Sequence, residues 1–132
     1  DAFGADGLFL LPGCADLYNP KTVRASMGAL FRLPAWRCTL EELAALSGHS
    51  GLPLLGSALR PDAADVRQAD LGAAVVMIGS EGRGLSSEAL ASCGGTVRIP
   101  MRERCESLNA AAAAAVLLWE GLRQSQDRFA RD

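Results

Sequence analysis

"VRIPMRERCESLNAAAAAAVLLWE", residues 97–120, is the stretch from which the fold is best read. A short β-like run stops at Pro100, and Asn109 leads into a run of six alanines. Alanine has the highest helix propensity, so we predict a helix from Asn109 to about Gln124. A polar cluster, residues 106–109, stands just before this helix. A helix that only filled a core would not need such a cluster at its N-terminus.

Upstream of this stretch, apolar runs alternate with helical patterns. We predict buried strands at residues 7–11, 52–59, 73–79 and 96–99, a short strand at 35–38, and a polar loop at 60–72. Helices are predicted at residues 19–33, 39–47 and 86–93. Strands that are apolar throughout and alternate with helices are typical of an α/β fold, with a mainly parallel sheet and helices on both faces.

Capping residues support the predicted helices. Asn19 is a good N-cap and is followed by proline at the first helical position. Thr39 and Glu42 have the spacing of a capping box. In the first helix, Val23, Met27 and Leu30 recur at helical spacing, which predicts an apolar face.

Composition limits the class of protein. The 132 residues suit one domain, and no apolar run reaches the roughly 18 residues of a membrane span. The four cysteines form no CxxC pair and the single histidine adds no ligand pattern, so we expect no metal site. Dispersed cysteines suggest reduced thiols and a cytoplasmic protein. The net charge of −2 does not indicate a nucleic-acid partner by itself, and only a local basic patch could bind one.

The first candidate site is the glycine-rich loop "GSEGRGL", residues 79–85, directly after a predicted strand. Ligands of open α/β sheets bind just beyond the carboxyl ends of the strands. Glycines allow the backbone to approach a ligand closely, but they also suit a tight turn, and both interpretations stay open. Glu81 could accept backbone hydrogen bonds or hold a ligand group, and Arg83 could contact phosphate or be solvated.

The second candidate site is the entrance to the alanine-rich helix. Asn109 can act simply as its N-cap, while Glu106 and Ser107 stand where the helix dipole favours negative charge. The alanines allow another helix to pack closely, either from the same chain or from a second copy.

The third candidate is a basic strip, formed by Lys21, Arg24 and Arg32. Lys21, Arg24 and Gly28 fall near one face of the predicted first helix, and the glycine leaves that face open. The strip could face RNA, or it could be an ordinary solvated helix face.

Taken in order, three stretches resemble the SpoU (TrmH-like) branch of the SPOUT RNA 2′-O-ribose methyltransferases. They are "NPKTVRASMGALFRLP", "VVMIGSEGRGLSSEAL" and the pair "VRIPM" and "ESLNAAAAAAVLLWE". The resemblance implies an α/β fold with a C-terminal deep trefoil knot, which is rare among proteins. It also implies a homodimer, formed through the last helix.

The resemblance assigns the site residue by residue. Gly79, Ile99 and Leu108 match the family's contacts to S-adenosylmethionine, and the loop at Gly56 and Ser57 is expected to touch the adenosyl group. The catalytic positions around the target ribose and the methyl donor match Glu81, Ser107 and Asn109. No metal is implied.

The implied reaction is methylation of a ribose 2′-hydroxyl in structured RNA, with ribosomal RNA favoured over transfer RNA. The family's first motif, which carries an arginine that activates the hydroxyl, is expected upstream of Asp1. Residues 1–132 would then form one SpoU-type domain without its first strand, and without the RNA-binding domain that often precedes it. Two alternatives stay open: a non-catalytic knotted module that binds the cofactor or dimerises, and a nucleotide-binding α/β protein, which would lack a phosphate loop.

Overall fold

The computed structural model describes residues 1–105 and 107–129, and for residues 127–129 it describes the backbone alone. The chain forms two compact units, Asp1–Leu43 and Ala44–Asp132. No helix within the described residues is long and apolar enough to cross a membrane.

The first unit contains a two-stranded parallel sheet. Both segments predicted as strands are confirmed, and β1 (Leu8–Leu10) pairs with β2 (Ala35–Arg37). The rings of Phe9 and Trp36, which are partners in the register, stack with centroids 5.4 Å apart. The prediction of a buried first strand was wrong for Leu8, which is 41% exposed, while the other two residues of β1 are partly buried. The pair therefore relies on this aromatic contact across neighbouring strands.

The predicted first helix is broken into two short pieces. Helix α1 (Pro20–Ala25) begins as expected, with the Asn19 side chain accepting a hydrogen bond from the Lys21 N–H. It ends before Met27 and Gly28, which both have positive φ, at 49° and 83°, and a 3₁₀ turn, η1 (Ala29–Phe31), follows. Left-handed residues cannot continue a right-handed helix. The predicted apolar face was therefore wrong, and so was the basic strip with Gly28 on one helix face.

Helix α2 (Leu40–Ser50) starts with the predicted capping box. The Thr39 N–H donates to Glu42 Oε2 at 2.8 Å, and the Glu42 N–H donates to Thr39 Oγ1 at 3.2 Å. The helix runs three residues beyond the predicted end, because Gly48 lies inside it. The residue that follows the helix in the left-handed conformation is Gly51, with φ of 71°. A glycine at this position is a common helix stop.

The second unit contains a four-stranded parallel sheet in the order β4-β6-β3-β5. Its strands are β3 (Leu54–Ser57), β4 (Ala64–Asp65), β5 (Val75–Met77) and β6 (Gly95–Arg98). The predicted α/β class with parallel strands is confirmed, although the strands form two sheets rather than one. Strand β4 lies inside the segment predicted as loop, because two residues carry no periodic signal.

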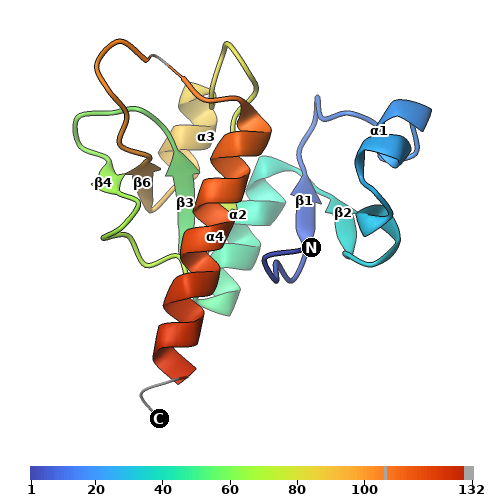
Figure 1. Cartoon of the computed structure of the whole chain (residues 1–132), viewed down its shortest axis with the longest axis horizontal. Helices are drawn as coiled ribbons and strands as arrows, with labels where there is room; N and C mark the ends of the chain where they lie inside the picture. Colours follow the sequence, from blue (N-terminus) through green and yellow to red (C-terminus); the bar gives the residue numbers. More distant parts are fainter. Residues whose placement is uncertain (106, 130–132) are drawn as a thin grey trace. The chain divides into compact units, whose positions relative to one another are not determined.

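Helices cover both faces of this sheet, as predicted (Figure 1). On one face, Leu55 packs against the core cluster that includes Val97 of β6 and Leu117 of α4 (Ala110–Phe129). The next residue, Gly56, faces the other side, where it approaches Leu90 of α3 (Ser87–Ser92). Val97 and Leu117 are 0% and 2% exposed, so truncating either one should cost several kcal/mol.

Helix α4 is fastened to the loop before β5. Gln124 accepts a hydrogen bond from the Leu71 N–H at 2.8 Å and donates to the Ala69 carbonyl at 2.9 Å. Gly121 lies so close to the Leu71 carbonyl that a Cβ would stand 2.9 Å from its oxygen. The helix extends past the predicted end at Gln124, while the fraying expected for the tail falls partly on residues 130–132, outside the described residues.

The position of β6 bears on the predicted knot. Residues 58–63 connect β3 to β4, and these strands pair with opposite edges of β6. Hydrogen bonds from the Ala58 N–H to the Val97 carbonyl and from the Val66 N–H to the Arg98 carbonyl hold both ends of this connection. The connection thus passes over the carboxyl end of β6, where the chain continues into residues 99–109. The knot itself stays a prediction.

Candidate functional site at the carboxyl ends of the parallel strands

Three loops of the second unit come together at one end of its sheet. Residues 58–63, 79–86 and the described residues of 99–109 follow β3, β5 and β6, and Figure 1 shows all three loops at the upper end of these strands. In parallel sheets, the carboxyl ends of strands are where ligands bind. The predicted cofactor and catalytic residues Gly79, Glu81, Ile99, Ser107, Leu108 and Asn109 lie in these loops.

The loop of residues 79–86 is folded back tightly on itself. Ser80 and Gly84 form an antiparallel bridge, with the Gly84 N–H donating to the Ser80 carbonyl at 2.9 Å. A Cβ at Gly79 would collide with the backbone of Gly84 and Leu85, so only glycine closes the loop. Gly79 thus has a structural role that is independent of any ligand, and Glu81 is placed within the turn.

Glu81 links this loop to the start of α4. The Asn109 Nδ2 donates to Glu81 Oε1 at 2.7 Å, and the Ala110 N–H donates to the same oxygen at 3.2 Å. Asn109 Oδ1 accepts hydrogen bonds from the N–H groups of Ala111 and Ala112 at 2.9 and 3.2 Å, which makes it the N-cap. The carboxylate also lies at the positive end of the helix dipole, where a negative charge is favoured. The loop and the helix are therefore one polar unit.

The polar groups of this unit remain accessible to a ligand. Glu81, Ser107 and Asn109 are all exposed. Asn109 has two amide hydrogens, and the 2.7 Å bond to Glu81 uses one of them. Ser107 lies two residues before Asn109, while the prediction for Glu106 falls outside the described residues.

Apolar side chains belong to the same group of loops. Leu59, just after β3, is 54% exposed, and Leu108 is 39% exposed. Ile99, the first residue after β6, is partly buried against the core cluster. Exposed leucines next to a polar turn suit a ligand with both an apolar and a charged part. Leu59 was missed in the sequence, although an apolar residue at the end of a buried strand was a usable signal.

Gly56 and Ser57 end strand β3 in the same region. A Cβ on Gly56 would stand 3.0 Å from Cys93 Sγ and 3.1 Å from Leu85 Cδ1, so Gly56 lets α3 pack closely. Any contact of Gly56 with a ligand would involve its backbone. Burial raises the pKa of the Cys93 thiol, which also donates to the Ala89 carbonyl at 3.2 Å. Cys93 is therefore protonated at neutral pH and serves packing.

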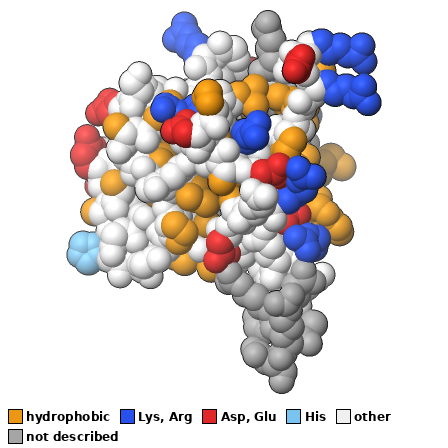
Figure 2. All heavy atoms as spheres, turned by 90° about the vertical axis from the view of Figure 1, so that its left-hand side faces the viewer, with side chains coloured by type: hydrophobic (Ala, Val, Ile, Leu, Met, Phe, Trp, Pro, Cys, Tyr) orange, Lys and Arg blue, Asp and Glu red, His pale blue; other side chains and the backbone are white. Residues whose placement is uncertain are grey.

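Charged side chains of both signs surround the loops. On the face shown in Figure 2, blue Lys and Arg side chains lie among red Asp and Glu side chains. Arg67 donates to both carboxylate oxygens of Asp65, at 2.9 and 2.6 Å. The hydrogen bonds from the Arg67 side chain and N–H hold the pKa of Asp65 well below its usual range. This face is balanced in charge, so it is not by itself a strong attractor for RNA.

The fold and the site together define an α/β protein with a candidate ligand site at the carboxyl ends of its parallel strands, between a glycine-closed turn and the N-terminus of its last helix. The chain belongs to the SpoU rRNA methylase family, whose family model matches residues 1–119. This confirms the resemblance seen in the sequence.

Curated relatives agree with this assignment. The chain is 40% identical over 131 residues to the 23S rRNA (uridine(2479)-2′-O)-methyltransferase of Streptomyces viridochromogenes, covering 94% of this chain and 45% of the relative. It is 31% identical to the 23S rRNA (guanosine(2553)-2′-O)-methyltransferase of Bacillus subtilis, covering 90% of this chain and 48% of the relative. The chain thus spans about half the length of these relatives.

Solved structures share the fold. An AdoMet-bound rRNA methyltransferase from Sinorhizobium meliloti superposes with a TM-score of 0.85 at 33% identity, covering 93% of this chain and 48% of that one. The SpoU methyltransferase AviRb from Streptomyces viridochromogenes, in complex with AdoMet, gives a TM-score of 0.84 at 38% identity, covering 96% of this chain and 52% of that one.

Proposed function

We propose that the protein transfers the methyl group of S-adenosylmethionine to a ribose 2′-hydroxyl in structured RNA. The observation that carries this proposal is the bond between Glu81 and Asn109, which joins the turn after β5 to the helix after β6 at the ligand-binding end of the sheet. Membership of the SpoU family supports the reaction class.

Ribosomal RNA is the favoured substrate. The two 23S rRNA relatives match 94% and 90% of this chain. A tRNA (guanosine(18)-2′-O)-methyltransferase of Thermus thermophilus matches only 56% of it, over 75 residues, although at 44% identity. The similarity to the rRNA enzymes is therefore the more extensive of the two, because it includes most of both units.

The residues of the site fit S-adenosylmethionine. Leu59 and Leu108 offer exposed apolar surface for an adenine ring, and the backbone around Gly79 and Ile99 lies at the strand ends where such a ligand is held. Glu81 provides negative charge near a cationic ligand. When bound, S-adenosylmethionine supplies an activated methyl group on a positively charged sulfur.

The side chains of the chain itself have two tasks in this mechanism. Glu81 fixes the orientation of Asn109, whose second amide hydrogen can then hold a ribose oxygen in line for transfer. The Ser107 hydroxyl can add a hydrogen bond to the same sugar. Lowering the effective pKa of the 2′-hydroxyl needs a nearby cation, which we assign to an arginine upstream of Asp1.

We further propose that these residues are one SpoU-type domain, completed by an upstream strand, with the chain after β6 knotted through the connection at 58–63. Strand β5 ends the four-stranded sheet and leaves one edge available for a further strand. The chain's coverage of about half of its relatives agrees with a longer protein. An RNA-modifying protein of this kind would act in the cytoplasm.

A homodimer is also proposed, with α4 at its interface. Ala112, Ala115, Val116 and Trp119 are exposed and recur at helical spacing, whereas Leu117 on the opposite side is buried. An exposed apolar stripe with small residues lets a second helix approach closely. Replacing Val116 with lysine should convert the dimer to a monomer in light scattering, while Ser92→Lys on α3 should not.

The reaction is tested with the full-length protein, tritiated S-adenosylmethionine and bacterial ribosomal RNA. A methyl group on a 2′-oxygen blocks alkaline cleavage of the following phosphodiester, so label should remain in alkali-resistant dinucleotides. Label in free bases would overturn ribose methylation. Cofactor binding with no transfer to any RNA would favour the non-catalytic alternative.

A further inference from the structure

A second candidate RNA contact lies in the first unit, in residues 17–37. This segment contains four cationic side chains and no carboxylate, in a chain whose net charge is −2. The cations are Lys21, Arg24, Arg32 and Arg37. Local positive charge of this kind attracts a polyanion even when the whole protein is acidic.

Two aromatic rings face solvent in the same segment. Tyr18 and Phe31 are 73% and 76% exposed, and both line a hollow of about 300 Å³. The remaining walls come from Leu17, Leu30, Arg32, Leu33, Pro34 and Ala35. Rings this exposed contribute little to the core. Flat apolar rings beside an open hollow are the arrangement on which nucleobases stack.

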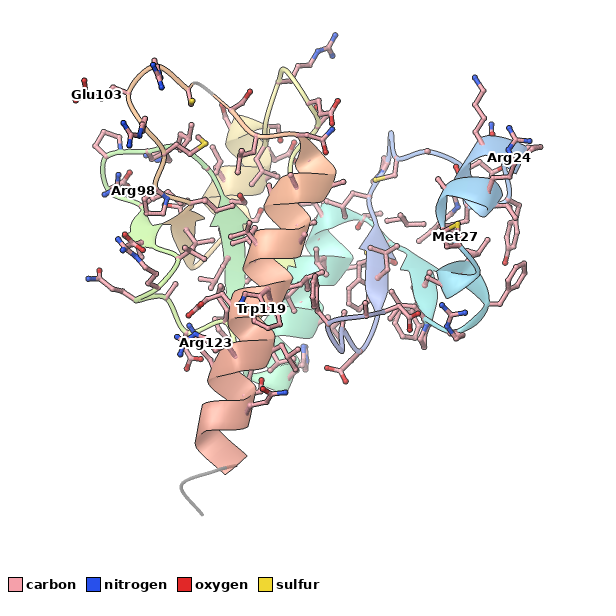
Figure 3. The ribbon with its side chains drawn as sticks, in the orientation of Figure 1. Arg24, Met27, Arg98, Glu103, Trp119 and Arg123 are labelled. Carbon is pink, nitrogen blue, oxygen red and sulfur yellow. The ribbon has the colours of Figure 1, made fainter. Side chains whose placement is uncertain are left out.

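The chain between Tyr18 and Phe31 contains a strained residue. Met27 has φ of 49°, a left-handed conformation that residues with side chains rarely adopt, and its side chain is 85% exposed. With Gly28 it reverses the chain between α1 and η1, which brings Tyr18 and Phe31 to one hollow. Figure 3 shows Arg24 pointing outward from α1, and Met27 on the turn that follows this helix. Strain with no packing gain is often retained for function.

Two of the four cations are available for a ligand. Arg32 pairs with Asp1 at 2.6 Å and Arg37 with Asp16 at 3.6 Å. Within the described part of the chain, Lys21 and Arg24 take part in no ion pair. Both lie on helix α1, which begins two residues after Tyr18, so the phosphates of an RNA strand whose base enters the hollow can reach positive charge that no carboxylate neutralises.

We propose that this surface, defined by Tyr18, Lys21, Arg24, Met27 and Phe31, binds an unpaired nucleotide of RNA. The base stacks on Tyr18 and Phe31, and the flanking phosphates are neutralised by Lys21 and Arg24. An apolar protein partner would cover the rings but leave the two cations without a counter-charge, which makes RNA the better match. The inference rests on the proposed function, because it gives the RNA substrate a second point of contact.

The test uses the chain and a single-stranded RNA that contains 2-aminopurine, whose fluorescence is quenched by stacking. We expect quenching on binding, and about tenfold weaker binding for Tyr18→Ala and for Phe31→Ala. Tyr18→Phe should retain binding, because it keeps the ring. Leu46→Ala is the matched control, since Leu46 is also an exposed large apolar residue, on α2.

The cations are tested through salt dependence. Lys21→Gln and Arg24→Gln should each reduce the slope of log affinity against log salt by about 0.7. Arg67→Gln, which removes an arginine that is paired with Asp65, is the control. Unchanged RNA affinity in folded Tyr18→Ala and Phe31→Ala proteins overturns the inference. Loss of self-association in those variants also overturns it, because the surface would then be a contact between protein chains.

Titration of S-adenosylmethionine into the same variants keeps the two proposals apart. Normal cofactor binding with no effect of Tyr18 or Phe31 on RNA overturns the inference alone. If the unmodified chain binds no cofactor, this result counts against methyl transfer. If RNA binding by the same chain depends on the Tyr18 and Phe31 rings, the RNA contact is supported.

Discussion

Glu81 and Asn109 are 28 positions apart in the sequence, yet Asn109 Nδ2 donates to Glu81 Oε1 at 2.7 Å. The same oxygen accepts from the Ala110 N–H, so one carboxylate holds both the N-cap residue and the first helical residue of α4. This contact joins the turn after β5 to the chain after β6, and both parts of the proposed cofactor site depend on it.

Glu81→Ala should therefore weaken the site in two ways. It removes both hydrogen bonds to the start of α4, which should reduce the free energy of unfolding by about 1 kcal/mol. It should also lower the affinity for S-adenosylmethionine, because the turn and the helix are no longer tied. Urea denaturation and calorimetry measure the two effects. Glu103→Ala, in the same group of loops, should change neither; equal behaviour of the two variants would remove Glu81 from the site.

Substitutions at Asn109 separate capping from positioning. Asn109→Asp keeps an oxygen that can cap α4, but it places a second carboxylate against Glu81. Asn109→Ala loses the cap, at about 1 kcal/mol. We expect both to reduce turnover of the full-length protein by more than their stability loss explains. If Asn109→Asp were as active as the unmodified protein, the bond to Glu81 would be unnecessary for catalysis.

Gly79 and Gly48 provide a matched pair of glycines. Gly79→Ala places a Cβ against the backbone of Gly84 and Leu85, so the turn cannot close and the cofactor affinity should fall at least about tenfold. Gly48 lies inside α2, and a Cβ there would have open space around it, with no described atom within 4 Å beyond the helix backbone itself. Gly48→Ala should stabilise the protein by about 0.5–1 kcal/mol. Thermal unfolding and cofactor titration of both variants check these opposite expectations.

Acid stability should depend on Asp65 and Arg67. The hydrogen bonds from Arg67 lower the pKa of Asp65 in the folded state below its value of 3.8 in the unfolded chain. This contribution to stability is fully present above the unfolded-state pKa and is lost as the pH falls through the folded-state pKa. Arg67→Gln should thus reduce stability at neutral pH and approach the unmodified protein in strong acid.

Chemical denaturation from about pH 7 down to about pH 2 measures this difference, since the range crosses the unfolded-state pKa of the carboxyl group. Arg83→Gln, in the glycine-rich turn, is the control and should show no pH-dependent difference. If the free energy of unfolding of Arg67→Gln differed from that of the unmodified protein by the same amount at every pH, the effect of Arg67 would be due to packing.

Gln124 should be important for the attachment of α4. Its side chain bridges the Leu71 N–H and the Ala69 carbonyl, in a partly buried position. Gln124→Ala leaves both groups without this partner and should cost about 1–3 kcal/mol in urea denaturation. Gln68→Ala, an exposed glutamine before the same loop, should cost much less. Similar losses for both would show that the bridge adds no specific stability.

Local sequence signals predicted the helix starts well. The caps at Asn19, Thr39 and Asn109 each depend on a side chain that bonds to backbone within three residues, so the sequence alone contains the cause. The interruption of the first helix was not visible in this way. Val23, Met27 and Leu30 have helical spacing, but Met27 is left-handed, and nothing local distinguishes it from a helical methionine.

Contacts between distant segments were harder to predict. Strand β4 exists because Ala64 and Asp65 pair with Val97 and Arg98, and two residues show no periodicity of their own. The family resemblance placed Glu81 and Asn109 in one site, but not their hydrogen bond. The exposed leucine at position 59 was also missed, because its role depends on which loops surround it.

The most direct measurement is a calorimetric titration of S-adenosylmethionine and S-adenosylhomocysteine into the chain, with ATP as the comparison ligand. We expect one-to-one binding of both sulfur ligands, no binding of ATP, and weaker binding by Glu81→Ala. A folded chain that binds neither sulfur ligand, or binds ATP equally well, would contradict the proposal that residues 56–59, 79–81 and 99–109 form a site for S-adenosylmethionine.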